Sequence, residues 1–437
     1  MKGGICLYQS KKILLAILLA AAAAIVWLAA VTAGSRNSAR QDELFQEAQT
    51  YIDDQIYVRA VPLLEEAAEI QTGRTGEVQR ALADCYRALG EEKPYLATLL
   101  TMLNADTADA DLYRETADHY FLNHKYQSGL DTLKEGIARL DSEELTDYYE
   151  SVRYAFTKSY AKYEDIRSMS DGFAAVCLEG KWGYLDADGD LTIPCVFDQA
   201  MDFENGSAAV IENGQVIVID TDGFRTALCK EAADSIAPFG QGVTSLRING
   251  KWRLANAEMR IGATEYDFIG TLSDGGRAVC RNGKWVLQNS SSEDQTDEFD
   301  GFSLDEKGCA YRNGRAFAKS GELTYLVDAT GTRISETGYT DAYPFLESDG
   351  LAAVCKDGKW GFLDKNGQEV LPFEWDSACS FSEGVAAVEK DGLWGYISLR
   401  GEIAVPLQYI GAKPFSERAA AVQTESGWSL IRFQANP

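Results

Sequence analysis

Few residues of this chain have the types and the spacing that catalysis or metal binding requires. The two histidines, His119 and His124, are five positions apart, whereas two histidines that bind one metal ion from the same helical face are three or four apart. Surface or packing roles are expected for both. The sequence has no serine nucleophile elbow, no Walker loop and no dinucleotide-binding glycine motif. We therefore predict no catalytic, cofactor-binding or metal-binding residues, no cofactor, and a protein that is not an enzyme.

One group of carboxylates resembles a calcium-binding loop. The segment Asp186–Asp190 has the sequence Asp-Ala-Asp-Gly-Asp. The related segments Asp220–Gly223 and Asp364–Gly367 repeat its shape but carry fewer carboxylates. Calcium takes six to eight oxygen ligands, whereas Asp, Asn and Gly are also the residues that turns between strands favour. A turn is the preferred interpretation, and a metal site is the alternative.

The nine cysteines contain no Cys-x-x-Cys pair, and they are Cys6, Cys85, Cys177, Cys195, Cys229, Cys280, Cys309, Cys355 and Cys379. Cys177, Cys280 and Cys355 each follow the valine of an apolar run, so we expect them to be small core residues. In an exported protein an odd number of cysteines leaves at least one thiol without a disulfide. No disulfide bond and no zinc site are predicted.

The stretch Gly172–Pro194 recurs through the carboxyl-terminal part of the chain. Its two apolar runs flank the turn Glu179-Gly180, a pattern typical of a β-hairpin. Asn-Gly or Asp-Gly stands at the same place in further copies, at Asn213-Gly214, Asn249-Gly250, Asn282-Gly283, Asn313-Gly314, Asp357-Gly358 and Asp391-Gly392, and Gly427 marks an eighth. The period is near 35 residues, with one insertion between Gly314 and Gly358. A period of this length predicts a repeat architecture.

A tryptophan follows the turn in most copies, at Trp182, Trp252, Trp285, Trp360, Trp394 and Trp428. Val216 and Ala316 stand at this position in the second and fifth copies. We predict that the tryptophan packs between neighbouring units, because apolar substitutes are tolerated there. The alternative is a platform on which a ligand such as a sugar stacks.

The repeated segments Lys181–Asp186, Lys359–Asp364 and Leu393–Ile397 resemble the WG-repeat family, which is named for its Trp-Gly pair. The resemblance extends from about Tyr163 to the end of the chain, and the middle copies depart from it. It implies a β-rich repeat domain found in many bacterial proteins, without a general catalytic activity. Each unit offers three or four short strands and must bury its aromatic residues against its neighbours. Eight such units predict a ring that closes as in a β-propeller, and an open β-repeat stack is the alternative.

The preceding region has a helical pattern that recurs every 34 to 35 residues. Leu44, Ala48, Tyr51, Ala60, Leu64 and Ala67 recur as Gln79, Ala83, Tyr86, Tyr95, Leu99 and Met102, and again as Tyr113, Ala117, Tyr120, Gly129, Leu133 and Gly136. Small residues where two helices would cross make this pattern similar to tetratricopeptide repeats. The resemblance implies stacked helices with a concave face that binds peptides in many relatives, and a spacer is the alternative. A further helix is expected from Asp141 to about Lys162.

The amino terminus contains an apolar segment, Ile13–Ala33, that is free of charge, proline and glycine. At 1.5 Å per residue its 21 residues would cross the roughly 30 Å hydrocarbon core of a bilayer. Lys2, Lys11 and Lys12 before the segment favour a cytoplasmic amino terminus, with the remainder of the chain outside the membrane. A cleavable signal peptide ending at Val31-Thr32-Ala33 is the alternative.

The predicted organisation is a multidomain protein with a transmembrane helix, tetratricopeptide-like helices and an all-β domain of eight hairpin units. The predicted parts are a cytoplasmic tail at 1–12, a transmembrane helix at 13–33, a linker at 34–42, a helical domain at 43–162 and a WG-repeat β domain at 163–437.

Composition restricts the choice of partner. With 41 basic and 67 acidic residues the net charge is −26, which makes nucleic acid an unsuitable partner. We predict a membrane-anchored, non-enzymatic scaffold at the bacterial cell envelope that binds a protein or peptide. The alternative is an envelope module that binds cell-wall polysaccharide through its repeated tryptophans. No site residue for either partner follows from the sequence.

Overall fold

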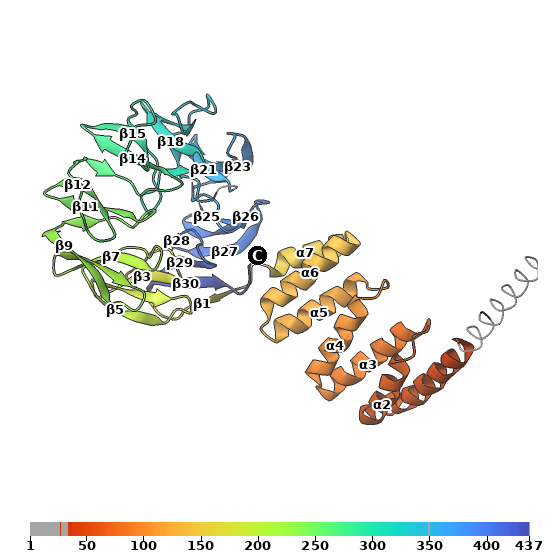
Figure 1. The fold of residues 1–437 in the computed structure, drawn as a ribbon. Coiled ribbons are helices and arrows are strands. Elements are labelled where there is room, and N and C mark those ends of the chain that lie inside the picture. The colour runs from red at the N-terminus through yellow and green to blue at the C-terminus, as the bar shows by residue number, and fades with distance from the viewer. Residues whose placement is uncertain (1–26, 28–33, 348–349, 437) are drawn as a thin grey trace, which may run out of the picture. The chain divides into compact units, whose positions relative to one another are not determined.

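The computed structural model describes Trp27, residues 34–347 and residues 350–436 (Figure 1). The chain divides into two compact units, Met1–Val152 and Arg153–Pro437. The first is helical and the second consists of β-sheets, so each unit is described by itself below.

The prediction of a transmembrane helix, and with it of a single-pass membrane location, is wrong for the part of the chain that the structure describes. None of the helices there is both long and apolar enough to cross a membrane. The predicted span, residues 13–33, lies outside the described residues except for Trp27.

The helical unit contains a helix at residues 34–53 followed by further helices joined by short turns. These are α2 (Tyr57–Ala68), α3 (Thr75–Leu89), α4 (Glu92–Leu103), α5 (Ala110–Leu122), α6 (Tyr126–Leu140) and α7 (Glu143–Val152). Successive helices pack against each other from α2 to α7. The predicted linker at residues 34–42 is part of the first helix, because its polar residues include no proline to interrupt it.

The recurring small residues lie where helices approach closely, as predicted. Gly136 of α6 is buried, and a Cβ atom built on it would lie 2.6 Å from Cγ of Tyr113 in α5. Turn chemistry fixes the helix ends: Gly90 ends α3 in the left-handed conformation, and the Asp109 side chain accepts a hydrogen bond from the backbone N–H of Leu112 at the start of α5. These residues set the helix lengths and the spacing between helices.

The second unit contains eight antiparallel sheets among its described residues, which we number as blades 1 to 8 in chain order. Blade 1 contains β2 (Asp165–Ile166), β3 (Phe173–Leu178), β4 (Lys181–Asp186) and β5 (Leu191–Phe197). Blade 2 contains β6 (Gln199–Ala200), β7 (Ser207–Glu212), β8 (Gln215–Asp220) and β9 (Arg225–Ala232). Blade 3 contains β10 (Ser235–Ile236), β11 (Val243–Ile248) and β12 (Lys251–Asn256). Blade 4 contains β13 (Phe268–Ile269), β14 (Gly276–Arg281) and β15 (Lys284–Asn289).

The remaining blades follow the same plan. Blade 5 contains β16 (Gly301–Phe302), β17 (Tyr311–Arg312), β18 (Arg315–Ser320) and β19 (Leu323–Asp328). Blade 6 contains β20 (Asp341–Ala342), β21 (Ala352–Lys356), β22 (Lys359–Leu363) and β23 (Glu369–Trp375). Blade 7 contains β24 (Ser377–Ala378), β25 (Val385–Lys390), β26 (Leu393–Ser398) and β27 (Ile403–Tyr409). Blade 8 contains β28 (Gly411–Ala412), β29 (Ala419–Thr424), β30 (Gly427–Phe433) and, as its outer strand, β1 (Phe156–Lys158).

The ring closes through blade 8, so the predicted β-propeller is confirmed. The first strand of the unit, β1, pairs antiparallel with the last, β30, and Phe156 lies opposite Phe433. Figure 1 shows the sheets arranged around a common centre. The helix expected between Asp141 and Lys162 therefore ends at Val152, because the residues after it complete this sheet, and the β unit begins before the predicted boundary at residue 163.

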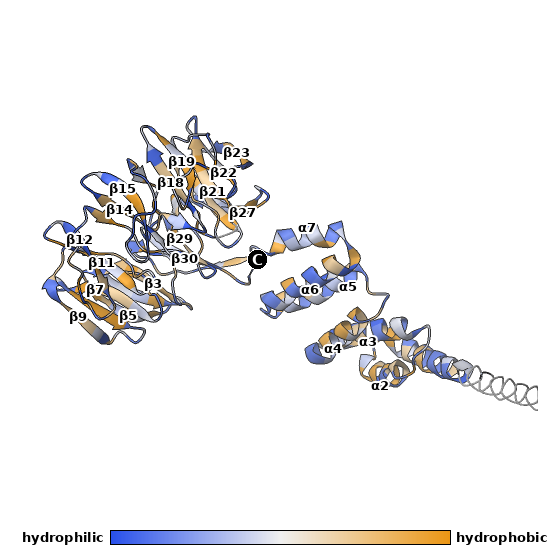
Figure 2. Cartoon of the chain, turned by 45° about the horizontal axis from the view of Figure 1, so that its top comes forward, coloured by the Kyte–Doolittle hydropathy of each residue, from blue (hydrophilic) through white to orange (hydrophobic). Residues whose placement is uncertain are grey.

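The hydrophobic core of the propeller lies between the blades. Eight clusters of buried side chains are described, and each combines residues from two neighbouring blades. Between blades 6 and 7, for example, Phe362 and Phe381 meet edge to face at 4.9 Å between ring centroids. Figure 2 shows hydrophobic strands bounded by hydrophilic turns. Since a blade has apolar residues on both faces, it is stable only between two neighbours.

In several blades a carboxylate after the outer strand accepts a hydrogen bond from the hairpin turn of the next blade. Asp376, which follows the outer strand of blade 6, accepts hydrogen bonds from Lys359 Nζ at 2.5 Å and from the backbone N–H of Asp391 in blade 7 at 2.8 Å. The hydrogen bond from Lys359 is the largest cause of the lowered pKa of Asp376. On one rim, Glu417 of blade 8 accepts from the Gly172 N–H of blade 1 at 2.7 Å.

The structure corrects the sequence alignment of blade 5. Its β-hairpin joins β18 to β19 at Gly321, whereas the turn Asn313-Gly314 joins β17 to β18. The residue in the tryptophan position is therefore Thr324, which pairs with Lys319, and not Ala316. A similar shift of one position affects the eighth copy, where Gly427 opens β30 opposite Thr424 and is not a turn residue.

The insertion lies before the hairpin of blade 5. Phe302 of its inner strand pairs with Ala318, 16 positions later, whereas Ile166 of blade 1 pairs with Val176, 10 positions later. The 10-position spacing recurs in blades 2, 3, 4, 7 and 8. Six residues are thus added between β16 and β18, and the segment Leu304–Cys309 accounts for them.

Candidate functional site

The tryptophan side chains lie between blades, which confirms the packing interpretation. Trp360 packs against the cluster between blades 6 and 7, and Trp182 packs against the cluster between blades 1 and 2. Each of the repeated tryptophans is partly buried in this way, with Val216 fully buried at the equivalent position. These contacts are the ones that the packing interpretation predicts, and the polysaccharide hypothesis has no support here.

The aspartate-rich segments are turns. The Asp186 carboxylate accepts hydrogen bonds from the backbone N–H groups of Asp188 at 2.9 Å and Asp190 at 3.0 Å. Asp364 makes the same two contacts, with Asn366 and Gln368. The first carboxylate is thus used to hold its own backbone, as the turn interpretation predicted.

The cysteines at the shared repeat position are core residues, as predicted. Cys177 lies opposite Trp182, Cys280 opposite Trp285 and Cys355 opposite Trp360, and all three cysteines are buried. The described cysteines are free thiols. Burial is the largest cause that raises the pKa of Cys177, to about 11, which keeps it protonated and unreactive at neutral pH.

The two histidines lie near the end of α5 but have separate surroundings. His119 meets the ring of Tyr95 edge to face at 5.1 Å, and its Nε2 lies 3.4 Å from Asn123 Nδ2. His124 follows the helix in the left-handed conformation and lies near Tyr126. In the part of the chain that the structure describes, no group of three or more His, Cys, Asp or Glu side chains could hold a metal ion.

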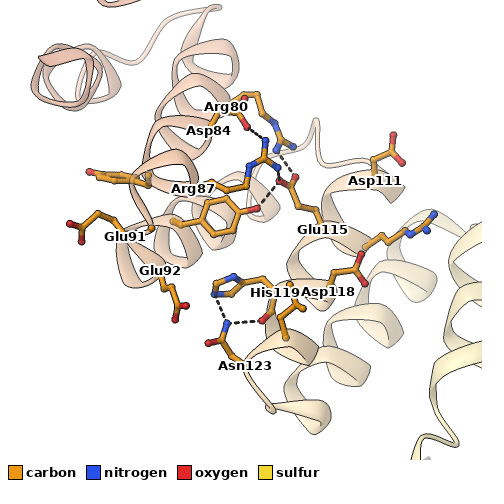
Figure 3. A pocket seen from close by; sticks show the side chains of 15 residues that line it. Arg80, Asp84, Arg87, Glu91, Glu92, Asp111, Glu115, Asp118, His119 and Asn123 are labelled. Carbon is orange, nitrogen blue, oxygen red and sulfur yellow. Dashed lines mark hydrogen bonds and ion pairs between the residues drawn. The ribbon is translucent and has the colours of Figure 1, made fainter. Parts of the chain in front are cut away.

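A groove of about 820 Å³ lies in the helical unit (Figure 3). Helices α3 and α5 form its two sides, and the start of α4 forms its end. Arg80, Asp84 and Arg87 share one face of α3 because they are spaced by four and three positions, and Asp111, Glu115 and Asp118 share one face of α5 for the same reason. We take this groove as the candidate functional site.

Glu115 organises the centre of the groove. Its carboxylate pairs with Arg80, lies 3.4 Å from Arg87 Nη1 and accepts a hydrogen bond from the Tyr95 hydroxyl at 2.8 Å (Figure 3). The Glu115 side chain is 22% exposed, so these bonds are partly shielded from water. Burial first, and then the bond to Glu115, raise the pKa of Tyr95 to about 12, so this hydroxyl remains a hydrogen-bond donor. One carboxylate thereby joins α5 to both α3 and α4.

The α7 helix supports the far side of α5. The Tyr148 hydroxyl donates a hydrogen bond to Asp118, and the Arg114 guanidinium lies over the Tyr148 ring at 4.6 Å. Burial, followed by the bond to Asp118, raises the pKa of Tyr148 to about 12. Asp118 and Arg114, which both line the groove, are therefore held by contacts within the unit.

The charge of the groove is negative. Its lining has three guanidinium groups, Arg80, Arg87 and Arg114, and six carboxylates, Asp84, Glu91, Glu92, Asp111, Glu115 and Asp118, which gives a formal charge of 3 − 6 = −3. Arg80 and Arg87 are bound to Glu115, and Arg87 also to Asp84 at 2.8 Å. Glu91, Glu92 and Asp111 are exposed. The groove thus presents carboxylates at its opening and an aromatic pair, Tyr95 and His119, on its wall.

This arrangement is suited to recognition. The groove contains carboxylates, a histidine and hydrogen-bond donors. Glu115 and Asp118, however, are bound to arginine and tyrosine side chains within the unit, which suits them to holding the groove together. None of these groove residues was predicted from the sequence. The polar positions spaced by four and three residues on α3 and α5 were the available signal, but a solvated helix face has the same pattern.

The centre of the propeller also holds cavities. Two of those described measure about 150 and 220 Å³, and both are lined by Lys307 and Arg312 of blade 5. They are smaller than the groove, and pockets that bind small molecules usually measure about 300 to 1,000 Å³.

Comparison with known proteins identifies the repeats. The family described as "WG containing repeat" matches residues 159–182, 182–215, 326–360, 360–394 and 394–428. These segments are WG repeats, and the predicted resemblance is confirmed for them. No curated protein matches the chain.

Solved structures show only distant similarity. A eukaryotic initiation factor has a TM-score of 0.42 at 12% identity, covering 60% of this chain and 79% of that chain. The WD40 domain of Neurospora crassa Pan2 has a TM-score of 0.36 at 9% identity, covering 64% and 96%. YrrB, described as a TPR protein with an unusual peptide-binding site, has a TM-score of 0.22 at 16% identity, covering 26% and 57%. Scores this low carry no functional conclusion.

Proposed function

We propose that this protein is a non-enzymatic interaction scaffold whose helical groove binds an extended, positively charged segment of a protein partner. The observation that carries this proposal is the groove of about 820 Å³ between α3 and α5, with its formal charge of −3. The propeller serves as the rigid body of the scaffold. Its WG repeats, closed into a ring, also support an interaction role.

The groove chemistry favours a cationic partner. Two of the three arginines in the groove are already bound to Glu115, so they offer an anionic ligand little positive charge. Glu91 and Asp111 are exposed at the opening, where a lysine or arginine of a peptide could reach them. His119, partly exposed on the groove wall beside the buried Tyr95, offers apolar ring surface to the aliphatic part of such a side chain.

A peptide suits the groove better than a compact ligand. The helical repeats resemble tetratricopeptide repeats, in which the concave face of stacked helices binds extended peptides. The groove is open along the two helices, and its polar lining can satisfy the backbone groups of a peptide. The net charge of −26 supports a basic partner over nucleic acid or another acidic molecule.

The proposal is tested by fluorescence anisotropy with the full chain and two labelled peptides of equal length, one rich in Lys and one rich in Glu. We expect binding of the Lys peptide alone, weakened by added salt. Replacing Glu91→Gln together with Asp111→Asn should weaken it by roughly tenfold, since each exposed pair contributes up to about 1 kcal/mol. The matched control, Asp131→Asn with Glu135→Gln on α6, removes the same charge outside the groove and should leave the affinity within about twofold.

The results distinguish the parts of the proposal. Binding of the Glu peptide in preference to the Lys peptide would contradict the charge argument. Equal losses of peptide affinity in the groove variant and the control variant would contradict the location of the binding site in the groove.

A further inference from the structure

The added segment of blade 5, Leu304–Cys309, is here called the plug. It begins after the inner strand β16 of blade 5 and returns to β17. The Asp305 carboxylate accepts hydrogen bonds from the backbone N–H groups of Lys307 at 2.9 Å and Cys309 at 2.8 Å, which folds the plug into a tight turn. This is the turn that Asp186 makes between β4 and β5. The plug is therefore an ordered turn in its own right.

The plug reaches the opposite side of the ring. Lys307 Nζ donates a hydrogen bond to Ser170 Oγ of blade 1 at 3.2 Å and lies 3.8 Å from the Asp202 carboxylate of blade 2. Its backbone is held by blade 4, where Thr271 donates from its N–H to the Gly308 carbonyl at 3.0 Å and from its hydroxyl to the Lys307 carbonyl at 2.5 Å. A segment of blade 5 that contacts blades 1, 2 and 4 must cross the centre.

Glu306 extends the plug toward the remaining blades. Its carboxylate lies 3.8 Å from Lys413 Nζ of blade 8. Tyr343 of blade 6 lines the same cavity as Glu306. The charge of Glu306 also contributes, after burial, to the raised pKa of Cys379 in blade 7, so that thiol lies close to the plug. The plug thus has neighbouring residues in blades 6, 7 and 8 as well as in blades 1, 2 and 4.

Stability does not explain why the plug carries charges. Burial is the largest cause that raises the pKa of Asp305 and of Glu306, so the ionised carboxylates are disfavoured where they lie. Neither side chain is fully shielded from water, since Asp305 is partly buried and the Glu306 side chain is 38% exposed, but a partly buried charge with imperfect pairing adds little to stability. What the plug provides is the filling of space at the centre of the ring.

We propose that the plug is a built-in seal that closes the central channel of the propeller to solutes and ligands. The geometry carries this inference: one ordered turn of blade 5 contacts blades 1, 2, 4 and 8 across the ring, and the cavities beside it that are described measure about 150 and 220 Å³. The propeller then meets partners through its rims and outer strands. This inference is independent of the groove and of any peptide that binds there.

The test uses Cys379 as a reporter of channel access. In the full chain, Δ304–309 restores the spacing of blade 1 between the inner strand and the next strand, so the ring is expected to close as before. Both proteins are treated with iodoacetamide, and labelling of each cysteine is followed by peptide mass spectrometry. Cys229, fully buried between blades 2 and 3, is the internal control for unfolding.

The seal predicts that Cys379, which is partly exposed with the plug in place, reacts at least tenfold faster in Δ304–309 than in the natural chain, while the fully buried Cys229 stays unreactive in both. The deletion gives iodoacetamide access to Cys379. It also removes the burial and the Glu306 charge that raise the pKa of the Cys379 thiol, so both changes increase its labelling. A second variant, Glu306→Ser with Lys307→Ser, keeps the loop length and should increase Cys379 labelling less than the deletion does.

Three results would overturn the proposal. Rapid labelling of Cys379 in the natural chain would show that the channel is open. Unchanged labelling in Δ304–309 would show that another group closes it. Joint labelling of Cys379 and Cys229 in both variants would show that the segment is required for folding and does not act as a seal.

Discussion

Phe381→Ala should destabilise the propeller more than Trp360→Ala, although the tryptophan is the residue that marks the repeat. Both side chains lie between blades 6 and 7. Phe381 is 1% exposed and contacts Phe362 edge to face, whereas Trp360 is partly exposed at the sheet surface. The two substitutions therefore leave different spaces behind.

The magnitudes follow from this difference. Removing a buried aromatic ring loses its transfer free energy and also leaves a cavity, which together cost about 3 to 5 kcal/mol for Phe381→Ala. The space left by Trp360→Ala is open to water, so mainly the transfer free energy is lost, about 1.5 to 3 kcal/mol. Phe381→Leu, the control, keeps most of the volume and should cost about 1.5 kcal/mol or less.

Urea unfolding followed by tryptophan fluorescence measures these losses in the full chain. Seven of the eight tryptophans lie between Trp182 and Trp428, and residues 34–152 contain none, so the signal reports the propeller and not the helical unit. The free energy of unfolding is obtained from the midpoint and the slope of the transition. A loss for Trp360→Ala equal to or larger than that for Phe381→Ala would refute the reasoning from burial.

Two further predictions concern helix packing and pH. Gly136→Ala should lower the free energy of unfolding of the helical unit by about 1 to 3 kcal/mol, because its Cβ would lie 2.6 Å from Tyr113 Cγ. In the control, Gly76→Ala, the added Cβ meets no atom within 4 Å and should not destabilise the unit. Thermal unfolding followed by circular dichroism at 222 nm compares the two variants, and equal losses of stability would contradict the close approach of Gly136 to Tyr113. The folded pKa of Asp376 is lowered by Lys359, so its carboxylate contributes stability above the unfolded value of 3.8, and this is lost as the pH falls through the folded pKa. Lys359→Met should therefore reduce the fall in Tm between pH 5 and about pH 2, and an unchanged profile would contradict the role of this pair.

The helical groove could not be derived from the sequence. The pattern of Arg80, Asp84 and Arg87 identifies one polar helix face, and that of Asp111, Glu115 and Asp118 identifies another. Whether two polar faces meet depends on how the helices between them cross, which small residues such as Gly136 control through contacts with distant side chains. A groove is therefore a property of the tertiary structure.

The sequence by itself determined the number of blades and the hairpin in most of them, because turns and apolar runs are local and repeat along the chain. It favoured a closed ring over an open stack, and the pairing of β1 with β30 decided between them. It also determined that Asp186 belongs to a turn, since the bonds that define the turn lie within five residues. Only the tertiary structure decided which turn of blade 5 is its hairpin, because Asn313-Gly314 and Gly321 are both acceptable turns and strand pairing selects between them. It also decided that Leu304–Cys309 crosses the channel, because the contacts of Lys307 with Ser170 and Asp202 join residues more than 100 positions apart. Contacts of that separation leave no periodic signal in a sequence, since they depend on the ring having closed.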